Sequence, residues 1–350
     1  MMRNNYHTLL GHTPISRGMI YWHDYCFNYF MNQNTRNNII RLRLDKTIMG
    51  GKYVTSNKCN LSCIWCHDDY FSNSKFTAIG NLDFYNIIRR ILDITCSEEA
   101  YIRFAGSGDP TVAGVDELQD LITRMNSIPE VSRISMTTNG ILLGSMIEKL
   151  KMAGLSDVTI SLNSLRKDGY YEYAGKNCLD KVLKSINSVL VTGLPLKINM
   201  IYSKLNHDEI GKFEQLSGRN GGIPIKVIDL LCTNGTKGIY LPLEHLYSHI
   251  ESKIVEKYEK EWPYKTTAYR LRSGAVFVFK SSHSENDCPN TSCVVRDKCL
   301  EGCRHSIRVG LDGVLKPCGI RNDNTVQLLR PNTSDQAIVK ALQSGGKYGF

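Results

Sequence analysis

The sequence lacks any apolar run of the length that crosses a lipid bilayer, about 20 residues. Its N-terminal stretch also lacks the compact apolar segment and small-residue cleavage site of a secretory signal. No low-complexity segment is present, and the 43 Lys and Arg residues form no dense tract. With 42% hydrophobic residues over 350 positions, the sequence predicts a cytoplasmic globular protein with a substantial core. Neither a membrane nor a nucleic acid is expected as its partner.

The chain carries a formal net charge of +9. A basic excess favours anionic partners, such as phosphorylated small molecules or an acidic protein surface. A solubilising surface charge explains the same excess equally well. Charge alone therefore does not decide between an anionic partner and a solubilising surface.

The twelve cysteines are unevenly spread, with three at 59–66 and five at 288–318. A disulfide framework would suit a small secreted protein, whereas clustered cysteines in a long chain without a secretion signal more often hold metal. The two groups therefore predict two metal centres.

An alternation of strands and helices runs from residue 52 to about 231. The predicted strands are 52–56, 101–105, 133–137, 157–161, 196–201 and 225–231, and the predicted helices are 82–95, 114–126, 144–154, 178–193 and 206–218. Such alternation predicts βαβ units, a parallel sheet and one edge that gathers the carboxyl ends of the strands. The expected fold is α/β, a partial (β/α)6 barrel over 49–240. An N-terminal extension over 1–48 and a C-terminal extension over 241–350 flank it.

Within that C-terminal extension, the sequence predicts three local structures. Residues 241–262 read as one amphipathic helix, and 269–280 as a hairpin with its turn at Ser273 and Gly274. A last helix is expected over 333–346.

Cys59, Cys63 and Cys66 form a C-x3-C-x2-C array directly after the first predicted strand. Structural zinc sites usually need four protein ligands, whereas three cysteines suit a [4Fe–4S] cluster with one iron open to another ligand. A zinc site completed by a distant histidine is the alternative. His67 follows Cys66 directly, which would strain that geometry.

The array and its position resemble the radical S-adenosylmethionine (SAM) enzymes. In that family SAM occupies the open iron, and its reductive cleavage yields a 5′-deoxyadenosyl radical that abstracts a hydrogen atom from the substrate. The resemblance implies that Cys59, Cys63 and Cys66 are the catalytic cluster ligands. It also implies an electron donor such as flavodoxin or ferredoxin.

Further strand ends match the family's SAM-binding elements. "AGSGDPT" (105–111) resembles a G-G-E-P element, with an inserted serine and with Asp109 in place of glutamate. "TTNG" (137–140) and "SLNS" (161–164) end the next two predicted strands. The resemblance implies these cofactor-binding residues: Trp65, Gly108, Asp109, Ser161 and Asn163.

Over roughly residues 50 to 320 the chain resembles the GTP cyclases of molybdopterin biosynthesis. The stretches that carry this likeness include "CNLSCIWC", "SMTTNGILL" and "RVGLDGVLKPC". The implied substrate-binding residues are Lys52, Arg103, Thr137, Lys197 and Arg308, with Lys52 in place of an arginine. Buried ion pairs with acidic neighbours are the alternative role of Arg103 and Lys197. The sequence also departs from the cyclases, because Ser306 replaces an arginine and Gly345–Gly346 is followed by "KYGF". A paralogue with another substrate fits these departures.

The second cysteine group predicts a metal site, and the resemblance implies that it holds an auxiliary [4Fe–4S] cluster. The implied ligands are Cys293, Cys299, Cys303 and Cys318, with Cys288 as the alternative to Cys293. A cluster with one iron left open to the substrate is the other arrangement that the sequence allows. A structural zinc ribbon is the alternative. The spacing resembles both the cyclases and the SPASM and twitch extensions of peptide-modifying radical SAM enzymes.

The sequence supports three alternative hypotheses for the function of the protein. The first is a radical SAM enzyme that abstracts hydrogen from a phosphorylated, GTP-like nucleotide. The second is a SPASM/twitch-type enzyme that modifies a peptide. The third is a zinc-stapled α/β binding protein without catalysis.

Overall fold

A computed structural model describes residues 39–44, 59–66, 79–105, 108–230, 236–260, 266–280, 307–310, 312–316, 325–330 and 333–344. Within these ranges no helix has the length and apolar character to span a membrane.

The described strands form one sheet whose central part is parallel. Neighbours run in the order β12-β11-β10-β1-β2-β3-β4-β5-β6-β9-β8-β7. The first six strands lie side by side in chain order and are parallel. They are β1 (Ile39–Leu44), β2 (Glu99–Phe104), β3 (Val131–Thr138), β4 (Asp157–Ser161), β5 (Leu196–Ile201) and β6 (Pro224–Ile228). Their carboxyl ends therefore meet at one edge, as the predicted (β/α)6 arrangement requires.

Each flank of the sheet is completed by strands from late in the sequence. β7 (Ile254–Lys260), β8 (Thr266–Leu271) and β9 (Val276–Lys280) form an antiparallel unit, and β9 pairs in parallel with β6. On the other flank β10 (Ile307–Val309) pairs in parallel with β1, followed by β11 (Val314–Lys316) and β12 (Val326–Gln327). The sheet thus crosses both expected boundaries, and the division into 1–48, 49–240 and 241–350 stays a prediction.

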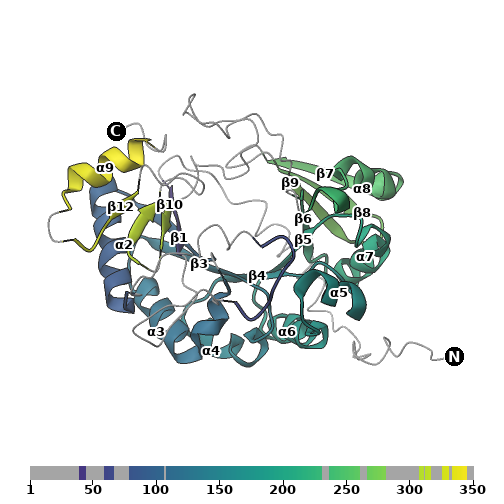
Figure 1. The fold of residues 1–350 in the computed structure, drawn as a ribbon, viewed down its shortest axis with the longest axis horizontal. Coiled ribbons are helices and arrows are strands. Elements are labelled where there is room, and N and C mark those ends of the chain that lie inside the picture. The colour runs from purple at the N-terminus through teal and green to yellow at the C-terminus, as the bar shows by residue number, and fades with distance from the viewer. Residues whose placement is uncertain are drawn as a thin grey trace.

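The helices follow the outer side of the sheet, which curves into an open arc (Figure 1). They are α2 (Asn81–Thr95), α3 (Val115–Asn126), α4 (Ile147–Ala153), α5 (Lys167–Ala174), α6 (Leu179–Thr192), α7 (Ile210–Arg219), α8 (Leu243–Ile250) and α9 (Asp335–Ser344). α9 lies beside α2, so the end of the described chain returns to the beginning of the arc.

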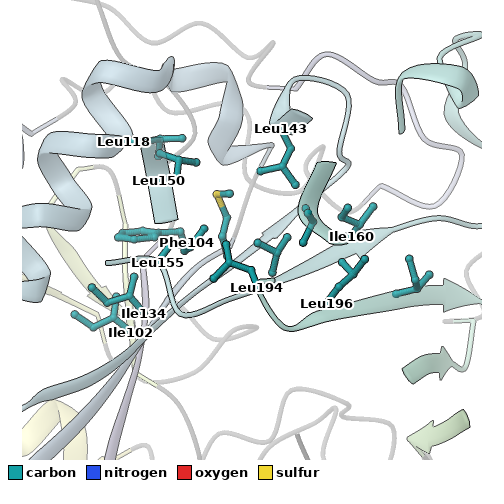
Figure 2. Close-up of a cluster of buried hydrophobic side chains, with 14 of the residues drawn as sticks. Ile102, Phe104, Leu118, Ile134, Leu143, Leu150, Leu155, Ile160, Leu194 and Leu196 are labelled. Atoms are coloured by element: carbon teal, nitrogen blue, oxygen red, sulfur yellow. The ribbon is translucent and has the colours of Figure 1, made fainter. Parts of the chain in front are cut away.

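The core lies between this helical layer and the outward face of the strands. Figure 2 shows Phe104 and Ile134 of the sheet below Leu118 of α3 and Leu150 of α4. Side chains alternate across a strand, so Ile102 and Phe104 enter this core while Arg103 projects from the opposite, concave face. Burial of the helix side therefore leaves the inner face of the arc for polar side chains.

Most predicted elements are confirmed. Five predicted strands correspond to β2–β6 and five predicted helices to α2, α3, α4, α6 and α7. The hairpin turn is also present, where Gly274 has a φ of 81° and its N–H donates to Leu271. The last helix is present as α9. The predicted strand over 52–56 lies outside the described residues.

Several sequence interpretations differ from the structure. Strands β1, β10, β11 and β12 were not among the predicted strands. The single helix expected over 241–262 is wrong, because α8 ends at Ile250 and β7 begins at Ile254. β-branched Ile254 and Val255 favour the strand, and the charges that follow suit the edge position that β7 holds. Helix α5 was not expected, since Gly169 and three tyrosines favour a helix weakly. Gly169 is required by packing, because a Cβ there would lie 2.5 Å from Ser164 Oγ.

Candidate active site

The loop 59–66, which carries the three-cysteine array, is attached to the C-terminal end of α5. Ser62 N donates to Ala174 O at 3.0 Å, and Ile64 N donates to Tyr173 O at 3.2 Å. The last carbonyls of a helix have no partner within the helix, so the loop uses acceptors that α5 leaves available. Helix α5 therefore positions the array, although more than a hundred residues separate the two.

Gly175 allows this close approach. It ends α5 with a φ of 69°, and a Cβ at this position would lie 3.0 Å from Ser62 O. A positive φ strains residues other than glycine, and a Cβ at this distance would press on the Ser62 carbonyl. Both constraints favour glycine at the point where the helix meets the loop.

Trp65 lies against Tyr173 in an edge-to-face arrangement, with ring centroids 4.7 Å apart and an interplanar angle of 65°. The Tyr173 hydroxyl shares a 2.5 Å hydrogen bond with the Ser203 hydroxyl. Tyr173 is thus fixed at both its ring and its hydroxyl, and it fixes Trp65 in turn. The predicted contact of Trp65 with SAM stays a prediction.

The three thiols differ in exposure but influence one another. Cys59 and Cys63 are half-buried and Cys66 is exposed. Burial raises the pKa of Cys63 to about 12, and the neighbouring Cys59 and Cys66 add to the effect. Without a positive partner the Cys63 thiol therefore remains protonated at neutral pH. Cationic irons would supply the charge that a thiolate needs here.

The donor set of the array suits a cluster. Cys59, Cys63 and Cys66 lie on one loop, and the influence of Cys59 and Cys66 on the pKa of Cys63, which adds to that of burial, places the three thiols near one another. Thiolates are the usual ligands of a [4Fe–4S] cluster, and three of them leave one iron open to another ligand.

Asp109 anchors the adjoining edge of the sheet. Its carboxylate is 2% exposed and accepts hydrogen bonds from Thr111 N at 3.0 Å and from the Thr138 hydroxyl at 2.9 Å. The Thr111 hydroxyl and the backbone N–H of Asn139 also donate to it. Burial raises the pKa of Asp109, and these four donors oppose that rise. The carboxylate thus joins the segment after β2 to the end of β3.

Asn139 extends this connection to the array. Its Nδ2 donates to Asn60 Oδ1 at 2.6 Å and lies 3.6 Å from Cys59 Sγ, a sulfur hydrogen bond. Its Oδ1 accepts from Ile141 N at 3.0 Å, which fixes the amide orientation. Asn139 was not among the predicted site residues, although the motif "TTNG" that contains it was. Asp109, Asn139 and Cys59 therefore form one chain of contacts.

The other expected SAM-binding residues occupy strand ends. Gly108 has a φ of 84°, and Ser161 is half-buried at the last position of β4. Asn163 has a structural task, because its Oδ1 accepts from Ile201 N at 2.8 Å. The structure places these residues at the expected edge, and their contact with SAM stays a prediction.

The concave face of the sheet carries the predicted substrate-binding side chains. Arg103 donates from Nε to Ser135 Oγ at 3.1 Å. Thr137 and Lys197 occupy one row across β3, β4 and β5, since both are in register with Thr159. Arg308 of β10 and Arg103 of β2 are each in register with position 43 of β1. The face therefore gathers hydroxyl and basic groups from strands far apart in the sequence.

Lys226 adds a basic group that the sequence interpretation missed. It is half-buried on β6, in register with Asn199 of β5, which is itself in register with Ser161. Strand alternation, "IPIKVI", was the signal that could have placed it on this face.

Several predicted site residues lie outside the described residues. They are Lys52, Cys288, Cys293, Cys299, Cys303 and Cys318. Their roles stay predictions.

Comparisons with known proteins agree on one family. Residues 53–216 match the Radical SAM superfamily. A GTP 3′,8-cyclase of Clostridium perfringens (strain SM101) is 31% identical over 75% of this chain and 78% of that protein. A probable GTP 3′,8-cyclase of Methanothermobacter marburgensis is 28% identical over 85% of this chain and 89% of that protein.

Solved structures show the same fold. The crystal structure of Streptococcus suis SuiB bound to precursor peptide SuiA has a TM-score of 0.58 and 16% sequence identity, covering 88% of this chain and 66% of that chain. At this identity the likeness concerns the fold alone.

Proposed function

We propose, since this chain belongs to the radical SAM superfamily, that it abstracts a hydrogen atom from a phosphorylated, GTP-like nucleotide. The family implies a [4Fe–4S] cluster with SAM. When bound, that pair supplies reductive SAM cleavage to a 5′-deoxyadenosyl radical. The superfamily is one of enzymes, which contradicts the non-catalytic zinc hypothesis.

In this proposal Cys59, Cys63 and Cys66 hold the cluster. Helix α5 fixes the loop through its terminal carbonyls, and Asn139 orients the Cys59 sulfur through its amide. Gly108, Asp109, Ser161, Asn163 and Trp65 surround SAM at the carboxyl edge of the sheet. Each contributes position rather than proton transfer, because hydrogen-atom abstraction needs no general base.

The observation that carries the substrate assignment is the basic, hydroxyl-bearing concave face. Arg103, Lys197, Lys226 and Arg308 project from four strands of one sheet, and Thr137 adds a hydroxyl. Guanidinium and ammonium groups form strong charge-assisted hydrogen bonds with phosphate oxygens. A nucleotide would therefore be held by its phosphates, with its sugar or base toward the cysteine loop. Lys52 is proposed as a further phosphate ligand.

The experiment is SAM cleavage by the anaerobically loaded enzyme, followed as 5′-deoxyadenosine. We expect GTP or a related nucleoside triphosphate to stimulate it, and guanosine to do so at least tenfold less. Lys197→Met and Lys226→Met should raise the KM for the triphosphate by about tenfold each, the value of one charge-assisted hydrogen bond. Lys184→Met, on the exposed side of α6, is the matched control and should leave KM unchanged. No stimulation by any nucleotide would contradict the assignment.

A peptide substrate is the second candidate. The spacing of Cys293, Cys299, Cys303 and Cys318 resembles SPASM and twitch extensions, and the fold is similar to that of SuiB, whose structure contains a precursor peptide. We propose that these four cysteines hold an auxiliary [4Fe–4S] cluster in either case. Roughly eight irons per chain would support it, and roughly four would contradict it. Flavodoxin or ferredoxin is the proposed electron donor.

A further inference from the structure

Tyr170 carries a buried hydroxyl whose role the proposed reaction does not explain. Its side chain is 3% exposed, and its Oη has no hydrogen-bond partner among the described residues. Buried hydroxyl groups are nearly always satisfied, because leaving one unpaired costs stability. The orphaned Oη therefore indicates an acceptor that the polypeptide alone does not supply.

The position of Tyr170 on α5 directs it toward the cysteine loop. It precedes Tyr173 and Ala174 by three and four residues, so all three share one face of the helix. The carbonyls of Tyr173 and Ala174 hold the amides of Ile64 and Ser62. The ring of Tyr173, on the same face of α5 as Tyr170, contacts Trp65 of the loop, so this face of the helix borders the array.

The electrostatic surroundings of the hydroxyl agree with this placement. Burial raises the pKa of Tyr170, and Cys178, Cys63, Asp109 and Cys59 raise it further in that order. The phenol therefore stays protonated and can only donate its proton to an anionic neighbour. Two of the three sulfur neighbours belong to the array.

We propose that Tyr170 donates its Oη–H to a sulfur of the cluster held by Cys59, Cys63 and Cys66, and thereby raises the reduction potential of that cluster. Hydrogen bonds to cluster sulfurs favour the more negative, reduced state. Tyr170 then tunes the cluster directly and makes the first electron transfer easier. This inference rests on the proposed function, because it needs the cluster at this loop.

The test compares Tyr170→Phe with Tyr171→Phe, which removes the same hydroxyl from a neighbouring side chain that is 59% exposed. Both proteins are loaded anaerobically, and the potential of the cluster is titrated by electron paramagnetic resonance without substrate. Tyr170→Phe should lower the ratio of reduced to oxidised cluster about tenfold at fixed ambient potential, about 59 mV for a one-electron couple. Tyr171→Phe should leave it unchanged. Equal potentials in Tyr170→Phe and wild type would overturn the inference.

The metal-free protein gives an independent readout. There Tyr170→Phe should leave the Tm equal or higher, because it deletes an unpaired polar atom. A Tm lowered by several degrees would reveal a partner within the chain and overturn the inference.

Cys178 is the competing acceptor. If the Tyr170→Phe shift persists in a Cys178→Ala background, the cluster sulfur is supported as the acceptor; if the shift disappears, the hydroxyl acts through Cys178 and the inference is wrong. Wild-type protein that takes up no cluster would contradict the proposed function itself, which separates the two failures.

Discussion

Each end of the parallel sheet buries an aspartate, and the two are satisfied in different ways. At the amino end Asp157 is fully buried and pairs with Arg133, whose Nε lies 2.6 Å from the carboxylate. At the carboxyl end Asp109 is 2% exposed and accepts hydrogen bonds from two hydroxyl and two backbone N–H groups. One carboxylate is thus compensated by a cation and the other by neutral dipoles.

The two ends of the sheet differ in purpose: the amino end stabilises the fold, and the carboxyl end positions the residues of the site. In α/β barrels the amino end of the strands contributes mainly to stability, and the carboxyl end builds the site. The Arg133–Asp157 pair joins β3 to β4 at the end remote from the cysteines. The Asp109 network leads instead through Asn139 to Cys59, and its carboxylate raises the pKa of Cys63 and Tyr170. The buried carboxylate at the site end therefore acts on the groups around the array, whereas the one at the opposite end joins two strands.

The largest stability loss is expected at the amino end. Arg133→Met leaves the Asp157 carboxylate buried without its cation, which should lower the free energy of unfolding by about 3–5 kcal/mol. Urea unfolding of the metal-free protein measures it. Arg124→Met is the matched control, since Arg124 forms an exposed i,i+4 pair with Asp120 and its loss should change the free energy of unfolding far less. Equal losses in both variants would contradict the distinct status of the buried pair.

Asp109→Asn should lower the free energy of unfolding less than Arg133→Met does, but it should reduce the binding of iron at the array. The amide has one acceptor oxygen, so donors such as Asn139 N–H lose their partner, at about 1–3 kcal/mol. Because Asn139 supports Cys59, the iron bound per chain should also fall. Asp116→Asn, at an exposed position in the first turn of α3, should change neither quantity. Full iron content in Asp109→Asn would show that this network does not position the array.

Gly175→Ala tests whether α5 holds the loop. The positive φ alone should cost about 1–2 kcal/mol, and the methyl group would press on Ser62 O. The free energy of unfolding, measured with urea, and the iron bound per chain should both decrease. Gly211→Ala is a favourable control, because that glycine lies in α7 with no atom within 4 Å of an added Cβ. It should be neutral or stabilising by up to about 1 kcal/mol. Unchanged iron in Gly175→Ala would contradict the role of α5.

The sequence predicted the features that are local along the chain. The spacing of Cys59, Cys63 and Cys66 and the position of Asp109 after a strand are visible in a few residues each. Tyr173 and Gly175 are different, because their importance comes from contact with a loop about 110 residues earlier. No local pattern encodes that contact.

The same limit explains the elements that were misassigned. Residues 254–260 have charges compatible with a helix, and only pairing with β8 makes them a strand. Helix α5 has weak intrinsic propensity and forms because Tyr170 and Tyr173 are buried on its inner face. Tertiary context decided both cases.

The smallest effect is expected from the pH dependence of Cys63. Its pKa is about 12 in the folded chain and 9.0 ordinarily, so from pH 9 upward the unfolded state loses a proton that the folded state keeps. The contribution of the Cys63 thiol to the free energy of unfolding is therefore present below pH 9 and is lost as the pH rises toward 12. Between pH 8 and 10, metal-free wild type should lose about 1 kcal/mol more than Cys63→Ser in urea unfolding. Cys66→Ser, which removes an exposed thiol, should keep the wild-type slope; if it flattens the slope equally, burial at Cys63 is not the cause.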